Sequence, residues 1–357
     1  MKKTSKFGRV ISVFVSFIIL TLSFSVNGAT LHVCKIGCEF SSIGNAINES
    51  ASGDRIRIQN GNYAENLRID KSITLVGANT RWVRITPSNP GSPALVVGPS
   101  SREVEITNVT VLGEGTRPEN GITVTGDSRL TITNSRVNSF KKGLITRDSS
   151  YLKIRKVDVE NFGVGVSGFD NSEVVVSGGG ISSGKTGLIA SDSSRITMVD
   201  TEVSSCSRNG LLVKETAKVN ILSASITNNQ APGIVLKDYS RLTMEDTQVS
   251  SNESGGVLLT DSAIANLTDN QITYNAKKNV SAISKTCGFS GPSDPFFGEV
   301  NGANNEIKPV DSNTVCPQKF SSITSNKGGS YSYPLKPSTY AFIGLIGAAT
   351  VFFLFSR

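Results

Sequence analysis

Histidine is almost missing from this 357-residue sequence, in which His32 is the single example. A chain with one histidine has few of the ligands that zinc sites require, and a Ser-His-Asp site would depend on that one residue. Sequence that is 38% hydrophobic can nevertheless bury a sizeable core. The composition therefore excludes wholesale disorder and a polytopic membrane protein, and it says more about shape than about reaction.

Positive charge is concentrated at the start of the chain. The formal net charge is +7, and four of these charges precede an apolar run over residues 10–26 and the small pair Gly28-Ala29. The four basic residues are Lys2, Lys3, Lys6 and Arg9. This order is typical of a secretory signal peptide over residues 1–28, with a retained N-terminal anchor as the alternative. Cleavage after Gly28 would leave a net charge of +3, which argues against a nucleic-acid partner.

The five cysteines are interpreted in the light of export. Outside the cytoplasm, paired cysteines favour disulfides over zinc. We therefore pair Cys34 with Cys38 and Cys287 with Cys316, and we predict that Cys206 is a buried free thiol. Metal or redox chemistry at these residues is the alternative.

A glycine-led repeat organises the middle of the chain. The leading glycines are Gly121, Gly143, Gly165, Gly187, Gly210, Gly233 and Gly256. The first four are evenly spaced, and from Gly187 onward the spacing is longer by a single position. Apolar residues recur one, eleven and sixteen positions after each glycine, and Ser, Asn, Asp and Gly separate them. Each repeat therefore predicts three short strands joined by turns.

Three strands in so short a repeat leave no room for a helix. This excludes leucine-rich, ankyrin and tetratricopeptide repeats, and one coil of a parallel β-helix fits instead. Equivalent residues would stack about 4.8 Å apart, with the inward columns forming the core. A left-handed β-helix is the structural rival, but its hexapeptide rhythm is not found. We predict an all-β, right-handed parallel β-helix solenoid of about ten coils.

Less regular coils are expected before Gly121, over residues 67–76, 83–85, 94–97 and 104–112. Ahead of them, three apolar residues follow a helical spacing, and Ser41 or Ser42 is available as the N-cap. These residues are Ile43, Ala46 and Ile47. We predict a short amphipathic helix that caps the open end of the core.

The segment FSSIGNAINESASGDRIRIQNGNYAENLRIDKSITLVG resembles the opening of secreted right-handed parallel β-helix proteins of the pectin-lyase-like superfamily. Phe297-Gly-Glu-Val-Asn-Gly-Ala-Asn-Asn-Glu-Ile and Val315-Cys316-Pro317 resemble the final coil of such proteins. The resemblance covers roughly residues 31–317 and implies the fold. It does not imply one activity, because the superfamily includes lyases, hydrolases, esterases, epimerases, adhesins and non-catalytic proteins.

The enzyme branches of this superfamily can be tested by motif. The Gln-Asp and Asp-Phe-x-Phe-Gly segments of pectin methylesterases are not found. The Asp-Asp and Gly-His-Gly motifs of polygalacturonases are not found either. Pectate lyases scatter their Ca²⁺-binding carboxylates and arginine base over neighbouring coils, so motifs leave that branch open.

One column of carboxylates lies five residues after the repeat glycine. Its members are Asp148, Asp170, Asp192, Glu215, Asp238 and Asp261. Stacked side chains of this kind are candidates for binding Ca²⁺ or another ligand. The structural interpretation is that each carboxylate caps its own turn. Arg129, Arg195, Lys218 and Arg241 could offset the charge of the column.

Phe140 and Phe162 occupy equivalent positions of adjacent coils. Exposed aromatic rows can stack on sugar rings, but simple stacking between coils is the preferred interpretation.

Composition changes after Pro317. Residues 318–339 are expected to form a flexible linker, and residues 340–357 a hydrophobic anchor or sorting tail. The apolar run over residues 340–355 is slightly short for a transmembrane helix. Pro334-Leu-Lys-Pro-Ser-Thr-Tyr followed by this run resembles the PEP-CTERM sorting signals of bacterial exopolysaccharide-associated proteins, with Lys336 in place of glutamate.

Taken together, the sequence predicts an exported, surface-associated and monomeric β-helix over residues 29–317. We expect it to bind a polysaccharide or matrix polymer without catalysis, with no cofactor other than Ca²⁺ and with membrane contact through the C-terminal segment. A polysaccharide lyase or hydrolase acting on acidic glycans, and an adhesin that works through protein contacts, are the alternatives.

Overall fold

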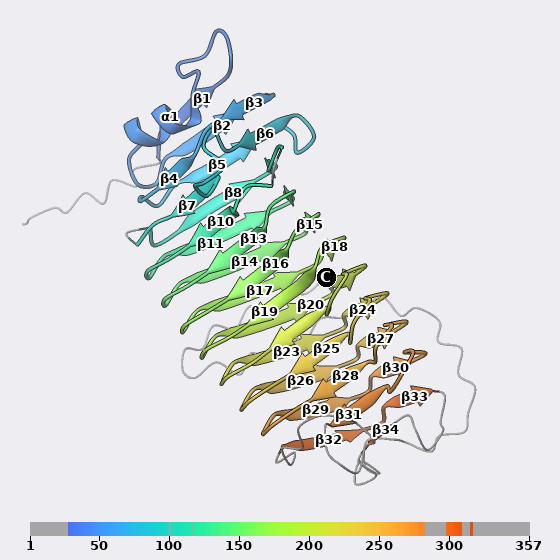
Figure 1. Ribbon diagram of the computed structural model, residues 1–357. Helices are drawn as coiled ribbons and strands as arrows, with labels where there is room; N and C mark the ends of the chain where they lie inside the picture. The colour runs from blue at the N-terminus through green and yellow to red at the C-terminus, as the bar shows by residue number, and fades with distance from the viewer. Residues whose placement is uncertain (1–27, 100, 116, 283–297, 309–314, 317–357) are drawn as a thin grey trace, which may run out of the picture. The chain divides into compact units, whose positions relative to one another are not determined.

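A computed structural model describes residues 28–99, 101–115, 117–282, 298–308 and 315–316. The chain divides into two compact units, Met1–Ser325 and Asn326–Arg357, and all described residues belong to the first. Within that unit the strands form three parallel sheets, which we call sheets A, B and C (Figure 1). Successive strands pass from A to B to C and then into the next coil, as expected for a parallel β-helix.

Sheet A has twelve strands, and sheets B and C have eleven each. Sheet A consists of β1 (Thr30–Val33), β2 (Arg55–Ile58), β5 (Thr74–Gly77), β8 (Val104–Thr107), β11 (Arg129–Thr133), β14 (Tyr151–Arg155), β17 (Glu173–Ser177), β20 (Arg195–Val199), β23 (Lys218–Leu222), β26 (Arg241–Glu245), β29 (Ile264–Thr268) and β32 (Glu299–Ala303). Sheet B consists of β3 (Gly61–Ala64), β6 (Val83–Thr86), β9 (Thr110–Leu112), β12 (Arg136–Asn138), β15 (Asp158–Glu160), β18 (Gly180–Ser182), β21 (Glu202–Ser204), β24 (Ser225–Thr227), β27 (Gln248–Ser250), β30 (Gln271–Thr273) and β33 (Glu306–Lys308). Sheet C consists of β4 (Leu67–Ile69), β7 (Leu95–Val97), β10 (Asn120–Val124), β13 (Lys142–Thr146), β16 (Val164–Gly168), β19 (Thr186–Ala190), β22 (Leu211–Val213), β25 (Ile234–Leu236), β28 (Val257–Leu259), β31 (Val280–Ala282) and β34 (Val315–Cys316).

The predicted solenoid and its irregular first coils are thus confirmed. Inward residues of the three sheets form one continuous apolar core, in which equivalent residues such as Ile132, Ile154 and Val176 pack in adjacent coils. Isoleucine, valine and leucine dominate this core because a half-buried pleated surface suits β-branched and aliphatic side chains.

Close approach between coils explains the repeat glycine. A Cβ atom on Gly121 would lie 2.5 Å from the carbonyl oxygen of Gly143, and one on Gly143 would lie 2.6 Å from that of Gly165. No side chain fits at such distances, so every regular coil needs glycine at this position.

The additional residue of the later coils enters the chain at one place. Strand β21 still pairs with β18 at the shorter offset, since Gly180 faces Glu202. The next strand, β22, pairs with β19 at the longer offset, since Leu188 faces Leu211. The additional residue therefore lies between β21 and β22, and it leaves all three sheets paired.

Two buried asparagine ladders run through the later coils. In one, the side-chain amide of Asn229 donates to Oδ1 of Asn252 at 2.8 Å, and that of Asn252 donates to Oδ1 of Asn275 at 2.9 Å. In the other, the amide of Asn270 donates to Oδ1 of Asn305 at 2.9 Å. Each amide also satisfies buried backbone groups, which explains how polar side chains are accommodated beside the core.

Helix α1 (Ile43–Glu49) covers the first coil, and Ser42 is its N-cap, as predicted. The Glu65 carboxylate accepts hydrogen bonds from the backbone N–H of Ile43 at 3.0 Å and of Gly44 at 2.7 Å. Three helix residues, Ile43, Ala46 and Ile47, are buried in the core. The helix is therefore fixed as an end cap by both polar and apolar contacts.

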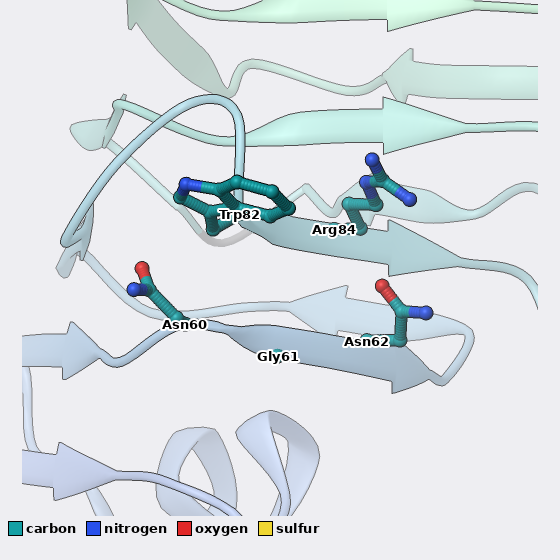
Figure 2. A pocket seen from close by; sticks show the side chains of 5 residues that line it. All are labelled: Asn60, Gly61, Asn62, Trp82 and Arg84. Carbon is teal, nitrogen blue, oxygen red and sulfur yellow. The ribbon is translucent and has the colours of Figure 1, made fainter.

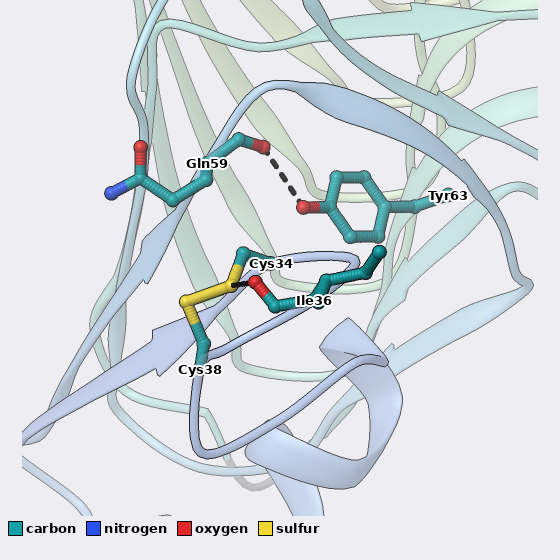
Figure 3. Close-up of a disulfide and its surroundings, with 5 residues drawn as sticks. All are labelled: Cys34, Ile36, Cys38, Gln59 and Tyr63. Atoms are coloured by element: carbon teal, nitrogen blue, oxygen red, sulfur yellow. Dashed lines mark hydrogen bonds between the residues drawn. A yellow bond between two sulfur atoms is a disulfide. The ribbon is translucent and has the colours of Figure 1, made fainter.

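A disulfide closes a loop beside this cap. Cys34 and Cys38 are bonded, with their Cα atoms 5.4 Å apart (Figure 3). Ile36 lies in the loop and is 93% exposed, whereas the buried Tyr63 donates its hydroxyl proton to the carbonyl of Gln59 at 2.8 Å. The first predicted disulfide is confirmed, and Cys206 is free and buried, as predicted.

Several sequence predictions fall outside the described residues. They are the signal peptide apart from Gly28, the partner Cys287 of the second predicted disulfide, the linker over residues 318–339 and the tail over residues 340–357. In the part of the chain that the structure describes, no helix has the length and apolar character needed to cross a membrane.

Candidate functional site

The structure brings the six predicted carboxylates into one column at the turn between sheets C and A. Each of them adopts a left-handed backbone conformation, with φ between 56° and 60°. The backbone N–H of Asp148 donates to Oδ2 of Asp170 at 3.0 Å, and the N–H of Asp170 donates to Oδ2 of Asp192 at 3.0 Å. The pattern continues through Glu215 and Asp238 to Asp261.

One oxygen of every carboxylate in this column is thus used to cap the turn of the preceding coil. At the first position Gly126 replaces the acidic residue, and its N–H donates to Oδ2 of Asp148 at 2.8 Å. These contacts give the column a structural role, but each carboxylate caps the turn of the preceding coil and not, as the sequence had indicated, its own turn. Among the described residues, no three or more His, Cys, Asp or Glu side chains gather in a way that could hold a metal ion. Ligand binding by the column stays a prediction.

Hydrogen bonds lower the pKa of three of these carboxyl groups. The pKa of Glu215 falls to about 2, first because the Lys214 ammonium lies 2.7 Å from Oε1 and then because Ser191 and the N–H of Asp192 donate to it. The Thr125 hydroxyl is the main cause of the lowered pKa of Asp148, and the Thr260 hydroxyl that of Asp261. These three carboxyl groups are therefore charged at neutral pH, which suits a cap and not a proton donor.

The cations that were expected to offset the column do not pair with it. Within the described residues, Arg129, Arg195, Lys218 and Arg241 form no ion pair with these carboxylates. The cations that act on the column are instead its sequence neighbours Arg147, Lys214 and Lys237. Arg129 lies over the ring of Tyr151, 5.1 Å from its centroid.

The preferred interpretation of the phenylalanine pair fits the structure. Phe140 and Phe162 are buried in the core, 0% and 2% exposed, so neither can offer a ring to a ligand. Glycine follows them in the same column, because a Cβ atom on Gly184 would lie 1.9 Å from the Phe162 ring. The exposed aromatic side chains lie elsewhere and include Trp82, Tyr239 and Tyr274.

A groove on sheet B surrounds Trp82, the single tryptophan of the chain. Its lining consists of Asn60, Gly61, Asn62, Trp82 and Arg84, and its volume is about 610 Å³. Figure 2 shows Trp82 and Arg84 at one side of the groove and Asn60 and Asn62 at the other. Strands β3 and β6 place these residues, because Asn62 pairs with Arg84 in register. We call this site the Trp82 groove.

The loop over residues 78–82 fixes one edge of the Trp82 groove. The Thr80 hydroxyl donates to the carbonyl of Asn134 at 2.9 Å, and the Thr80 carbonyl accepts from the Thr110 hydroxyl at 2.8 Å. The guanidinium of Arg81 stacks on the indole of Trp82, 4.9 Å from the ring centroid. Trp82 is thus held in place while 49% of it remains exposed.

A second pocket of about 510 Å³ lies along the same loop. Its lining is Ala78, Asn79, Thr80, Arg81, Asn108 and Arg136. Arg81 therefore contributes to both sites, because it stacks on the indole of Trp82 at the groove and also lines the second pocket. Neither lining contains an acidic residue.

The sequence patterns do not predict the Trp82 groove. Its residues lie in the irregular coils before Gly121, where no period marks which positions point outward. The one available signal was the single tryptophan next to two arginines, Arg81 and Arg84.

Family comparison identifies the class of protein to which this chain belongs. The model of the right-handed β-helix region matches residues 93–231 and 143–290, together more than half of the chain. The chain is thus a member of the right-handed β-helix family. A comparison of the sequence with curated proteins found no match.

Solved structures share this fold at low sequence identity. The Dettilon tailspike protein gp208 and ORF18 of Geobacillus virus E2 each have a TM-score of 0.58 and 13% identity over 74% of this chain. The similarity covers only 56% and 58% of those two chains. The A-module of the Azotobacter vinelandii mannuronan C-5 epimerase AlgE4 has a TM-score of 0.52 and 14% identity, over 76% of this chain and 92% of that one. At these identities the similarity shows the fold alone.

Proposed function

We propose that this protein is an exported, surface-associated β-helix protein that binds polysaccharide through the Trp82 groove without catalysing a reaction. The observation that carries the proposal is the groove itself. It combines an exposed indole, fixed from one side by Arg81, with the side-chain amides of Asn60 and Asn62. An indole face stacks on the apolar face of a sugar ring, and amides can donate to and accept from its hydroxyl groups.

Three further observations support this proposal. The AlgE4 A-module, which shares the fold, comes from an enzyme named for its action on the polysaccharide mannuronan. The bonded pair Cys34–Cys38 fits an exported protein, since disulfides persist in oxidising compartments. The sequence of residues 1–28 and 340–357 supports export and attachment at the outer side of a membrane.

Binding without catalysis is supported by the role of the carboxylates. The acidic column uses one oxygen of each carboxylate to cap a turn, and the Trp82 groove has no acidic side chain in its lining. A glycoside hydrolase would need two carboxyl groups at the bound sugar. Nothing in the groove lining provides them.

Affinity electrophoresis tests the proposal. The full-length protein is run through gels that contain individual polysaccharides, and the Trp82→Ala variant is compared with Tyr239→Ala, which removes an exposed aromatic side chain outside the groove. We expect at least one polysaccharide to retard the protein, and Trp82→Ala to weaken that binding about tenfold or more, equivalent to roughly 1.4 kcal/mol. Tyr239→Ala should bind normally.

Polymer length is measured in the same samples by size-exclusion chromatography. We expect it to stay constant. Shortening of the polymer, or new absorbance from unsaturated ends, would contradict binding without catalysis and favour a hydrolase or a lyase. If no glycan of a broad panel retards the protein, the polysaccharide proposal is wrong and an adhesin is favoured.

A further inference from the structure

We infer that the Trp82 groove takes an acidic sugar polymer, a polyuronate, whose carboxylate binds the guanidinium of Arg84. The inference rests on the proposed function and specifies the ligand of the same site. Three features support it: the charges along the 78–82 loop, the free state of Arg84, and the spacing of Arg84 and Trp82.

The charged residues that line the two pockets beside the loop all have one sign. The two pockets that border residues 78–82 are lined by Arg81, Arg84 and Arg136 and by no aspartate or glutamate. Low-dielectric walls that carry one sign of charge concentrate ligands of the opposite sign.

Of these three arginines, Arg84 is available to a ligand. Arg136 lies 3.9 Å from Asp158 and 3.8 Å from Glu160, and Arg81 stacks on Trp82. Arg84 has no ion pair within the described ranges, and its register partners on the two neighbouring strands are the neutral Asn62 and Thr110. An arginine without a carboxylate partner has its planar fork of donors free for bidentate binding of a carboxylate.

The spacing of Trp82 and Arg84 suits a single sugar unit and its neighbour. The two residues are two positions apart along the chain, with the inward Val83 between them, so their side chains extend on the same face of sheet B about 7 Å apart. Asn62 lies beside Arg84 at the inter-strand distance of about 4.8 Å. A pyranose ring stacked on the indole would thus bring the carboxylate of that unit, or of the next, to the guanidinium, and its hydroxyl groups to the amides.

A matched pair of probes separates the carboxylate from the rest of the sugar. β-1,4-linked oligomannuronate and β-1,4-linked oligomannose of equal length share linkage and ring configuration and differ in the carboxylate. Trp82 is the single tryptophan, so its intrinsic fluorescence reports ligand binding at the groove in the full-length protein. Each oligosaccharide is titrated at low and at physiological salt.

We expect oligomannuronate to bind at least tenfold more tightly than oligomannose, and this preference to shrink as salt rises. Arg84→Gln should remove the preference and leave the weaker binding of oligomannose unchanged. Arg84→Lys keeps the charge but loses the planar fork of donors, so its preference for oligomannuronate should lie between those of the original protein and Arg84→Gln. Arg195→Gln removes an arginine on sheet A, outside both pockets, and should behave like the original protein. Circular dichroism checks that each variant is folded.

The outcomes distinguish this inference from the proposed function. If both oligosaccharides bind equally, and Trp82→Ala weakens polysaccharide binding in the affinity gels, the groove binds sugars and only the acidic preference is wrong. The same holds if Arg84→Gln keeps the preference. If dextran sulfate binds more tightly than oligomannuronate through Arg84, the groove recognises sulfate esters and the carboxylate assignment is overturned. If neither these oligosaccharides nor any polysaccharide of the affinity gels binds through Trp82, the proposed function itself is wrong.

Discussion

Replacement of Asn252 by alanine should destabilise the protein by about 3–5 kcal/mol, because a buried hydrogen-bonding side chain would be lost from its ladder. Asn252 is fully buried, and its side chain makes four hydrogen bonds. Oδ1 accepts from the backbone N–H of Asn229 at 3.1 Å and from its side-chain amide at 2.8 Å. Nδ2 donates to the carbonyl of Ile226 at 3.1 Å and to Oδ1 of Asn275 at 2.9 Å.

The magnitude follows from what each partner keeps in the variant. The Asn229 N–H loses its acceptor outright, and a buried unsatisfied donor costs about 1–3 kcal/mol. The side-chain amide of Asn229 keeps only a long contact to the Val203 carbonyl at 3.5 Å. The two bonds donated by Nδ2 contribute roughly 1 kcal/mol each, because their acceptors retain other partners or reach them by small shifts.

Urea unfolding followed by circular dichroism measures the loss. Asn266→Ala is the matched control, because Asn266 is an exposed asparagine on β29 whose Oδ1 accepts a hydrogen bond of 3.2 Å from the side-chain amide of Asn301. This variant should lower the free energy of unfolding by no more than about 0.5 kcal/mol. Asn252→Asp keeps the acceptor but turns a carboxylate oxygen toward two other acceptors, so it should cost at least as much as alanine. If Asn252→Ala costs less than about 1 kcal/mol, or no more than Asn266→Ala, the ladder does not stabilise the coils through these hydrogen bonds.

Three further predictions concern other parts of the described structure. Gly184→Ala should lower the free energy of unfolding by about 1–3 kcal/mol, because its Cβ would lie 1.9 Å from the buried Phe162 ring. Gly180→Ala should avoid this clash, because the nearest atom to its Cβ would be 3.9 Å away. Equal losses of stability in urea unfolding would contradict the packing argument. The pKa of Glu215, about 2, is lower than the usual 4.5, so its charge should stabilise the fold above about pH 4.5 and lose this effect as pH falls toward 2. Glu215→Gln should therefore flatten the fall in melting temperature across that pH range. A melting temperature that falls as steeply in the variant as in the original protein would refute the assignment. Burial raises the pKa of the Cys206 thiol to about 11, so it should react with iodoacetamide at pH 8 only after the protein is unfolded in urea. Mass spectrometry that finds Cys206 modified in the folded protein would show that the thiol is accessible.

Much of the fold could be predicted because one residue type marks every regular coil. Glycine recurs where the backbone of the next coil comes too close for a Cβ atom, as at Gly121 and Gly143. That steric requirement repeats with the coil, so it is visible in sequence as a period. The carboxylate column is visible for the same reason, since each member occupies a left-handed turn at a fixed distance from the glycine.

The asparagine ladders show what such a period leaves undetermined. Asn229, Asn252 and Asn275 recur at the same interval as the later glycines Gly210, Gly233 and Gly256, so their spacing was available as a signal. Asparagine is also a common turn residue, however, and spacing does not show whether its side chain points outward or into the core. Burial decides between the two, and burial depends on how each turn is packed.

The Trp82 groove could not be predicted because it depends on irregularity. It forms where a loop leaves sheet A at Ala78 and returns to sheet B at Val83, held by contacts of Thr80 with Thr110 and Asn134. These partners are 30 and 54 residues away from Thr80, and no local pattern connects them. Sequence identified the scaffold, whereas the shape of the groove follows from long-range contacts.

The single residue added between β21 and β22 has a consequence for how surfaces on this protein can change. The strands on both sides of that turn keep their partners, so chain length in the turn is independent of the pairing that stabilises the core. A turn can therefore be lengthened into a loop that contacts a ligand while the coil beneath it stays the same. Recognition and folding are thereby separated along the chain, and new binding surfaces can evolve one turn at a time.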